Sequence, residues 1–268
     1  MMLIVFGLPL SFSLYLSFRG WTAARSITGG DFVGFENYAY LLGDPAFIQS
    51  LILTNILTVV TVFFEVLLGL CIALALNREI PFVQVARTIL IMPMMMTPIV
   101  AAMCWKLLFD PQYGLINYLL GTEHVWLGDR YLAPIAISLV NVWQSTPYVA
   151  LLLLAGLRSI PSDPYEAAAI DGANRWQQFW HITLPALQPT LLVAILLRTI
   201  FEFRTFENVY VMTGGGPGGA TNVMSIFTYM LTFIQFDFTL GAASSWLMLL
   251  SSFVLCAIPI LFFRLVGR

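Results

Sequence analysis

The feature that most constrains the fold of this chain is a series of long apolar runs. A helix needs about 20 largely apolar residues to cross the hydrocarbon core of a bilayer. In lipid, a helix satisfies its backbone hydrogen bonds internally and a lone strand does not. We therefore predict an all-α fold, a polytopic transmembrane helical bundle with about six spans, at 1–18, 51–76, 88–109, 132–157, 189–212 and 241–263.

The composition supports a membrane protein and excludes other classes. Of the 268 residues, 59% are hydrophobic and only 10% are charged, whereas a soluble domain usually carries about 25% charged residues. With a formal net charge of −2, the chain is not expected to bind nucleic acid, and membrane lipid is its expected surrounding. We expect a multi-pass protein of a cell membrane, with a single transmembrane domain over 1–268.

The cysteines and histidines do not suggest catalysis or metal binding. Cys71, Cys104 and Cys256 lie in apolar runs without metal-ligand spacing, so we expect buried small hydrophobic side chains. His124 and His181 also lack partners at metal spacing, and no nucleophile–base arrangement is present. We expect no catalytic residue and no metal site.

Two apolar segments, 1–18 and 221–240, each allow an interpretation besides a membrane span or in place of one. The run at 1–18 has no basic segment before it and no clear cleavage site after it, so we expect a span rather than a signal peptide. We also expect a cytoplasmic N-terminal tail ahead of it in the full protein. The segment 221–240 contains Gln235 and Asp237, and we expect it to be a helix lying at the outer interface rather than a seventh span.

The basic residues near the span ends favour a cytoplasmic N-terminus, because inner loops are enriched in Lys and Arg. This orientation places the polar loop 158–188 on the cytoplasmic side. The inner set is Arg78, Arg87, Arg158, Arg175, Arg264 and Arg268, and the outer set is Arg19, Arg25, Lys106 and Arg130.

The loop 158–188 contains the signals of a short helix with defined ends. Asp163 is the expected N-cap, Pro164 suits the first helical position, and Glu166 follows three residues after the cap. The alanines at 167–169 are strong helix formers. Gly172 is expected to supply a left-handed C-terminal stop.

A second helix is expected directly after this stop. Asn174 can cap it with Gln177 in the reciprocal position, and Pro185 either ends it or leads it into the next span. Its aromatic residues are Trp176, Phe179 and Trp180. The residues alone allow two interpretations: a rigid helical projection that docks in a partner's groove, or an amphipathic helix lying on the lipid surface.

The same loop resembles the EAA motif of binding-protein-dependent ABC importer permeases. The residues that match the motif, at every defined position, are Glu166, Ala167, Ala168, Gly172, Ile182, Leu184 and Pro185. The stretches at 32–42, 151–173 and 210–221 are similar to the carbohydrate-uptake branch of that family. The resemblance runs over nearly the whole chain and is greatest to maltose- and glycerol-phosphate-type permeases, without the large extra periplasmic domain of the former.

The resemblance implies a set of partners and a coupling role. The coupling helix would seat Glu166, Ala167, Ala168, Asp171 and Gly172 in a cleft of a separate ATPase subunit. The other expected partners are a second permease subunit, the second ATPase of an ATPase dimer, and an extracytoplasmic solute-binding protein. ATP and Mg would be bound by the ATPase subunits, so this chain would bind no cofactor and would be a transport subunit rather than an enzyme.

The stretch "GGGPGGAT" at 214–221 is not expected to bind a nucleotide. A phosphate-binding loop of the Walker type needs Lys followed by Ser or Thr after its glycines, and neither follows here. We expect a flexible turn after the fifth span. The resemblance adds contact with the binding protein as a second role.

Polar residues inside two spans suggest a path for a solute. A charge within a span costs at least about 2.5–3.5 kcal/mol, and helical spacing puts the polar residues of each span on one face. Sugars need polar partners for their hydroxyls and flat rings for their apolar faces. The expected solute-path residues are Asn141, Gln144, Ser145, Tyr148, Arg198, Phe201, Glu202 and Thr205.

A structural alternative remains open for these residues. Arg198 and Glu202 can form an internal ion pair that only holds the bundle together. Arg204 and Glu207 are expected within the same span, and Glu65 is expected to be a lone, hydrogen-bonded structural residue.

The predicted function is the permease subunit of an ATP-driven importer for a sugar or a glycerol-phosphate-like solute. The alternative is a secondary transporter driven by an ion gradient, with Glu65, Arg198 and Glu202 as coupling charges. No internal repeat pairs the two halves of the chain, as such transporters often show, and the EAA-like loop would be unexplained. A membrane-embedded enzyme lacks any catalytic constellation.

Overall fold

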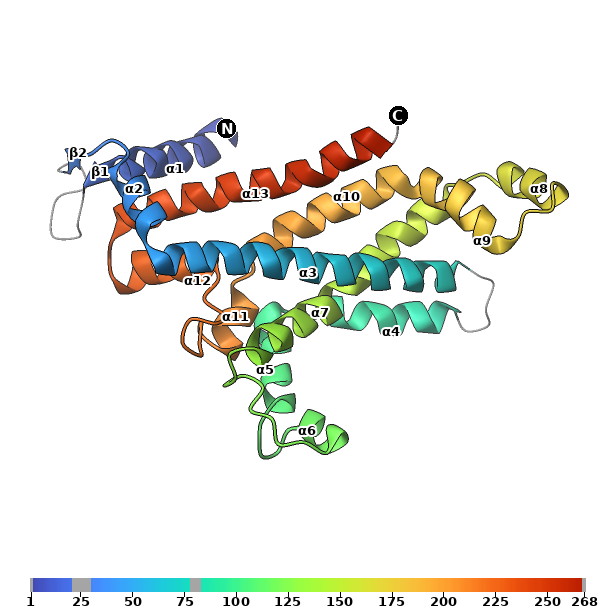
Figure 1. Ribbon diagram of the computed structural model, residues 1–268, viewed down its shortest axis with the longest axis horizontal. Helices are drawn as coiled ribbons and strands as arrows, with labels where there is room; N and C mark the ends of the chain where they lie inside the picture. Colours follow the sequence, from blue (N-terminus) through green and yellow to red (C-terminus); the bar gives the residue numbers. More distant parts are fainter. Residues whose placement is uncertain (1, 21–29, 78–82, 267–268) are drawn as a thin grey trace.

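The computed structural model describes residues 2–20, 30–77 and 83–266 and shows a bundle of long helices (Figure 1). The long helices are α1 (Met2–Ser17), α3 (Pro45–Leu76), α7 (Leu132–Arg158), α10 (Leu184–Phe203) and α13 (Phe238–Val266). The short helices are α2 (Glu36–Gly43), α4 (Val83–Met95), α5 (Pro98–Leu108), α6 (Leu115–Leu120), α8 (Asp163–Ile170), α9 (Arg175–Gln178), α11 (Glu207–Met212) and α12 (Met224–Tyr229). Two π-helical segments, η1 (Phe179–Thr183) and η2 (Met230–Ile234), and a two-residue antiparallel pair, β1 (Arg19–Gly20) with β2 (Asp31–Phe32), complete the described elements.

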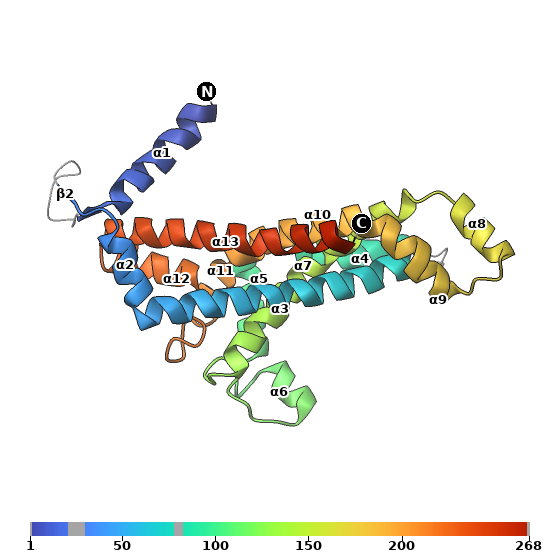
Figure 2. The ribbon, with the colours of Figure 1, turned by 45° about the horizontal axis from the view of Figure 1, so that its top comes forward.

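The described residues confirm an all-α membrane bundle. Four helices are long and apolar enough to span a membrane: Pro45–Leu76, Leu132–Arg158, Arg175–Phe203 and Phe238–Arg264. A fifth span arises if the bent pair α4 and α5 is counted as one. The apolar helix Val5–Ser17 is shorter than these, and Figure 2 shows α1 diverging from the bundle toward its N-terminus. The count of six spans therefore stays a prediction.

The predicted span at 88–109 is broken in its middle, between α4 and α5. The axes of α4 and α5 differ by 97°. A residue that precedes proline is disfavoured in the helical region, and Thr97, which precedes Pro98, is extended at φ −66° and ψ 144°. The break directs α5 and α6 away from the long axis of the bundle (Figure 1).

The fifth span also differs from the expected range 189–212. It begins earlier, because α9, η1 and α10 form one apolar helix over Arg175–Phe203, so Pro185 leads the loop into the span. It also ends earlier, at Phe203, and α11 starts only at Glu207. The intervening turn is held by Ser225 Oγ, which donates to the Thr205 carbonyl oxygen at 2.5 Å. Arg204 and Glu207 therefore lie beyond the end of this span.

The segment 221–240 is folded into the bundle rather than lying on its surface. Met224 and Ile226 of α12 are fully buried, and the Phe227 ring packs edge-on against Phe47 of α3 at 5.6 Å between centroids. The run Met224–Ile234 is too short for a span, as expected. The side chains of its first part are covered within the bundle, whereas Phe233 and Ile234 near its end are 59% and 61% exposed, so only the first part differs from the expected interfacial helix.

One end of the bundle collects the polar loop and several of the basic residues. The C-terminal ends of α3, α7 and α13, the start of α4, and the loop that holds α8 and α9 all lie at this end (Figure 1, Figure 2). The residues of the inner basic set that are described there are Arg87, Arg158, Arg175 and Arg264. Arg78, Arg268 and Arg25 lie outside the described residues.

The most extensive contact between described helices joins α3 and α7, and small residues lie in it, as is common in membranes. A Cβ atom added at Gly69 would lie 2.7 Å from Val149 Cγ1 and 3.2 Å from the Ala150 backbone nitrogen. The two backbones can therefore approach this closely only with glycine at position 69. This approach brings the polar faces of α3 and α7 together.

We predict that Gly69→Val forces α3 and α7 apart and lowers the free energy of unfolding by about 1–3 kcal/mol, as overpacking does elsewhere. The measurement is the melting temperature of the purified transporter complex. Gly7→Val is the matched control, because a Cβ at Gly7 of α1 meets nothing within 4 Å. Equal melting temperatures for the two variants would contradict the assigned packing.

Candidate functional site

A polar cavity of about 430 Å³ lies where α4, α5, α7, α10 and α11 meet. It is lined by all eight predicted solute-path residues: Asn141, Gln144, Ser145, Tyr148, Arg198, Phe201, Glu202 and Thr205. The lining is completed by Met94, Met96, Pro98, Arg204, Glu207 and Asn208. The helical spacing within two separate spans thus identified side chains that converge on one space.

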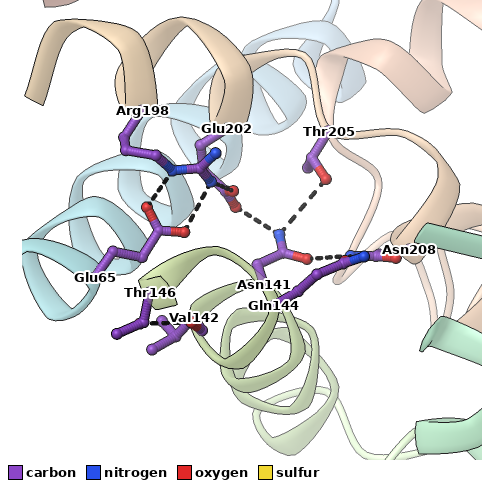
Figure 3. A network of polar contacts seen from close by, with 9 residues as sticks. All are labelled: Glu65, Asn141, Val142, Gln144, Thr146, Arg198, Glu202, Thr205 and Asn208. Carbon is purple, nitrogen blue, oxygen red and sulfur yellow. Dashed lines mark hydrogen bonds and ion pairs between the residues drawn. The ribbon is translucent and has the colours of Figure 1, made fainter. Parts of the chain in front are cut away.

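Three charged side chains form a buried ion network beside the cavity (Figure 3). Arg198 donates from Nε to Glu65 Oε2 at 2.7 Å and from Nη2 to Glu65 Oε1 at 2.8 Å. A longer contact of 3.4 Å joins Nη2 to Glu202 Oε2. All three are buried: Arg198 is 8% exposed, Glu65 0% and Glu202 4%. Buried charges are tolerated because each has such a partner.

This network corrects one prediction and confirms another. Glu65 is hydrogen-bonded, as expected, but it is not alone, since it holds Arg198 in a two-point contact. The expected Arg198–Glu202 pair exists but is the longer of the two contacts. Spacing along one helix could suggest the Glu202 contact, whereas the Glu65 contact joins α3 to α10 and has no signal in local spacing.

A chain of side-chain amides extends the network across the cavity (Figure 3). Asn141 Nδ2 donates to Glu202 Oε1 at 2.5 Å. Asn208 Nδ2 donates to Asn141 Oδ1 at 2.6 Å and lies 3.3 Å from Gln144 Oε1. Sequence reasoning missed Asn208, and the signal that could have found it is a single amide within the otherwise apolar run that follows Glu207.

The break between α4 and α5 contributes backbone to the site. Met96 lies in this break, and its carbonyl oxygen accepts a hydrogen bond from Gln144 Nε2 at 3.0 Å. A backbone carbonyl outside a helix needs such a partner when water is scarce. The helix break and the polar face of α7 therefore support each other.

An aromatic ring and a further cation lie at the exposed side of the cavity. Phe201 is 48% exposed, and the Arg204 guanidinium carbon lies 5.5 Å from the centre of its ring. Tyr148 lines the cavity from α7. The site therefore combines hydrogen-bonding groups with flat apolar surfaces.

The predicted coupling residues lie far from this cavity, at the end of the bundle (Figure 1). None of the residues of α8 is buried. The helix ends as expected: Gly172 has φ +82°, its N–H donates to the Ala169 carbonyl at 3.1 Å, and the Ala173 N–H donates to the Ala168 carbonyl at 2.9 Å. This pair of bonds is the Schellman arrangement.

The start of α8 differs from the expectation and the start of α9 agrees with it. Ser162 occupies the N-cap position of α8, so Asp163 is the first helical residue rather than the cap. Asn174 and Gln177 form the expected reciprocal capping box, at 2.9 and 2.8 Å. The Tyr165 hydroxyl lies 3.0 Å from Thr183 Oγ1 and ties α8 to η1. The loop is therefore held at both helix ends and at its base.

The glycine-rich stretch after α11 forms the expected turn. The Thr221 hydroxyl donates to the Gly216 carbonyl at 2.5 Å and lies 2.7 Å from the Thr213 hydroxyl. Gly215 and Gly219 have φ of +92° and +80°, a backbone region that only glycine adopts readily. Side-chain hydrogen bonds therefore close this turn.

The burial of the cysteines agrees with the expectation at only one of the three positions. Cys256 is buried, whereas Cys71 and Cys104 are exposed on the apolar surface of the chain. Within the described ranges, no group of three or more His, Cys, Asp or Glu side chains could hold a metal ion.

Comparison with known proteins gives consistent matches. Residues 65–268 match the family described as binding-protein-dependent transport system inner membrane component. The chain is similar to the trehalose/maltose transport system permease protein of Thermococcus litoralis, with 42% identity over 241 residues that cover 88% of this chain and 80% of that protein. It is also similar to the sulfoquinovosyl glycerol transport system permease protein of Agrobacterium fabrum, with 34% identity over 257 residues covering 93% and 82%.

Solved structures of similar fold are ABC transporters. A chain of a bacterial ABC transporter involved in the import of the acidic polysaccharide alginate superimposes with a TM-score of 0.84 at 21% identity, covering 99% of this chain and 92% of that chain. An inward-facing chain of the MetNI methionine ABC transporter gives a TM-score of 0.63 at 20% identity, covering 87% and 99%. At these identities the likeness concerns the fold.

We predict that Arg198→Met lowers the free energy of unfolding by about 3–5 kcal/mol, because Glu65 and Glu202 would remain buried without a cation. The measurement is thermal unfolding of the purified complex. The double variant Glu65→Gln/Arg198→Met should recover most of the loss, since one buried carboxylate is removed with the cation. A double variant less stable than Arg198→Met would contradict the paired-charge account.

Proposed function

The chain belongs to the family of binding-protein-dependent transport system inner membrane components, and from this membership we propose that it forms the translocation path for a sugar or sugar-like solute in an ATP-driven ABC importer. As a member of the family, it is a multi-pass permease component of the inner membrane. The finer parts of the proposal concern the solute, the coupling loop and the partner subunits.

The observation that carries the proposal is the polar cavity within an otherwise apolar bundle. Polar side chains at membrane depth face a bundle interior or a water-filled path and mark routes for solutes. The cavity offers amides, a hydroxyl at Ser145 and the half-exposed ring of Phe201, a combination suited to a sugar. Relatives named for trehalose, maltose and sulfoquinovosyl glycerol transport favour the same solute class.

The coupling part of the proposal places α8 in a cleft of a separate ATPase subunit. Glu166, Ala167 and Asp171 are exposed, Ala168 is partly exposed, and Gly172 ends the helix. A short helix that is closed at its C-terminal end and tied to η1 through Tyr165 can transmit the movement of a partner that grips it. ATP and Mg are bound by a dimer of such ATPase subunits, and this chain hydrolyses nothing itself.

The remaining proposed partners are a second permease subunit and an extracytoplasmic solute-binding protein. One of the structures of similar fold is an alginate transporter in complex with an alginate-bound periplasmic protein, which supports a binding protein as partner. The glycine-rich turn at 214–221 is a candidate contact for it.

A secondary transporter driven by an ion gradient is not favoured. The charges that would carry the coupling ion, Glu65, Arg198 and Glu202, are bound to one another. The family membership is also that of an ABC importer component.

The test of the coupling proposal is Gly172→Pro. Proline requires a φ near −65° where Gly172 has +82°, and it removes the N–H that closes the end of α8. We expect the amount of ATPase subunit that co-purifies with the chain to fall at least about tenfold, equivalent to a loss of about 1.4 kcal/mol, while the level of the chain in the membrane is kept.

Gly121→Pro provides the matched control. Gly121 ends α6 with φ +63°, so the substitution imposes the same backbone conflict in a different loop. Co-purification of the ATPase should be unaffected in this variant. Undiminished co-purification with Gly172→Pro, or equal loss in both variants, would contradict the assignment of α8 as the coupling helix.

A further inference from the structure

The buried end of the cavity holds more carboxyl groups than cations. Among the described residues, the buried charged side chains are Glu65, Arg198 and Glu202. One guanidinium therefore faces two carboxylates. This end of the cavity therefore carries no net positive charge, in surroundings of low dielectric where charges interact strongly.

Arg198 is the buried cation, and its guanidinium is already paired with the carboxylate of Glu65. The carboxylate of Glu65 takes two of its donor nitrogens, Nε and Nη2, at 2.7 and 2.8 Å. Paired contacts of this kind fix the plane of the guanidinium as well as neutralising it. The second carboxylate, on Glu202, faces the same nitrogen Nη2 at 3.4 Å. An anionic solute that approached Arg198 would compete with both carboxylates.

The other groups of the inner cavity favour a solute that brings hydroxyl groups. The hydroxyls of Ser145, Tyr148 and Thr205 and the amides of Asn141 and Gln144 line the cavity. Hydroxyl and amide groups both donate and accept hydrogen bonds, so they suit the uncharged hydroxyls of a sugar.

The second cation of the cavity lies at its exposed side. Arg204 is exposed and rests against the Phe201 ring, and Glu207, also exposed, lines the same side. Water and salt screen charges in such a position. Arg204 therefore provides weak attraction for an anion compared with the repulsion at the buried end.

We propose that Glu65 is a specificity-determining residue, which neutralises and orients Arg198 so that the cavity accepts an uncharged, hydroxyl-rich solute and rejects anionic sugars. The inference rests on the proposed function of the cavity as the solute path. It divides the sugar class further, because sugars that carry carboxylate, phosphate or sulfonate groups are excluded. The proposal thereby groups this chain with the relative named for trehalose and maltose and separates it from the relative named for sulfoquinovosyl glycerol, whose sugar carries a sulfonate. Removing the Glu65 charge leaves Arg198 with only the longer contact to Glu202 at 3.4 Å, so its guanidinium becomes available to an anion.

The test measures weak binding to the intact transporter complex in lipid nanodiscs, by saturation-transfer difference NMR without the binding protein. The probes are methyl glucoside and methyl glucuronoside, which differ in a hydroxymethyl group against a carboxylate at C6. In the native protein we expect the glucoside to bind at least about tenfold more tightly, because like charges at a binding site suppress the wrong ligand. In Glu65→Gln the preference should shrink by about tenfold.

The double variant Glu65→Gln/Arg198→Met distinguishes an effect of charge on solute preference from an effect of misfolding. It removes the cation together with its partner and leaves Glu202, so the preference for the glucoside should persist. Probe binding by the double variant tests the proposal even if Glu65→Gln alone does not fold. Gain of glucuronoside binding in the double variant would overturn the inference.

Two other outcomes are decisive. Equal binding of both probes to the native protein, or an unchanged preference in folded Glu65→Gln, would overturn the role of Glu65 and leave the solute path intact. Binding of neither probe to the native protein would instead overturn the sugar path itself.

Discussion

The two-point contact between Arg198 and Glu65 is the interaction on which the centre of this bundle depends. It joins α10 to α3 beside the polar cavity. A charge at membrane depth is stable only with a partner, so each helix needs the other in this position. Gly69, one helical turn after Glu65 in α3, lets α7 approach α3 closely. Asn141 then connects α7 to Glu202 of α10. The polar network therefore fixes three helices around one space.

The cavity exists because two helices end beside it. Irregular backbone at membrane depth is tolerated where it is buried in protein or lines a water-filled space. The break at Thr97 presents the Met96 carbonyl, which Gln144 satisfies, and the turn after Phe203 presents the Thr205 carbonyl, which Ser225 satisfies. Had α4–α5 and α10–α11 been continuous helices, as the apolar runs alone suggest, these backbone groups would be paired within helices and the cavity would lack part of its lining.

The sequence predicted what depends on short-range patterns. Helical spacing within α7 and α10 identified seven of the eight solute-path residues that line one cavity, while Thr205 lies in the turn after α10. The glycine and capping signals placed both ends of α8 and the start of α9 to within a residue. It did not predict contacts between helices distant in the chain. Glu65 lies 133 positions from Arg198, and no local period relates them. The direction of α5 after Pro98 and the burial of α12 likewise depend on packing that apolar runs do not encode.

The central claim is that the polar cavity is a solute path whose access is controlled by a partner ATPase. The most direct measurement places a single cysteine at Ser145, on the cavity wall, in a background without Cys71, Cys104 and Cys256. Its reaction with a membrane-impermeant thiol reagent is then followed from each side of the membrane, with and without vanadate-trapped nucleotide on the ATPase. The account predicts that the side from which Ser145→Cys is labelled changes with the nucleotide state. Labelling from the same side in both states, or from neither side in either state, would contradict it.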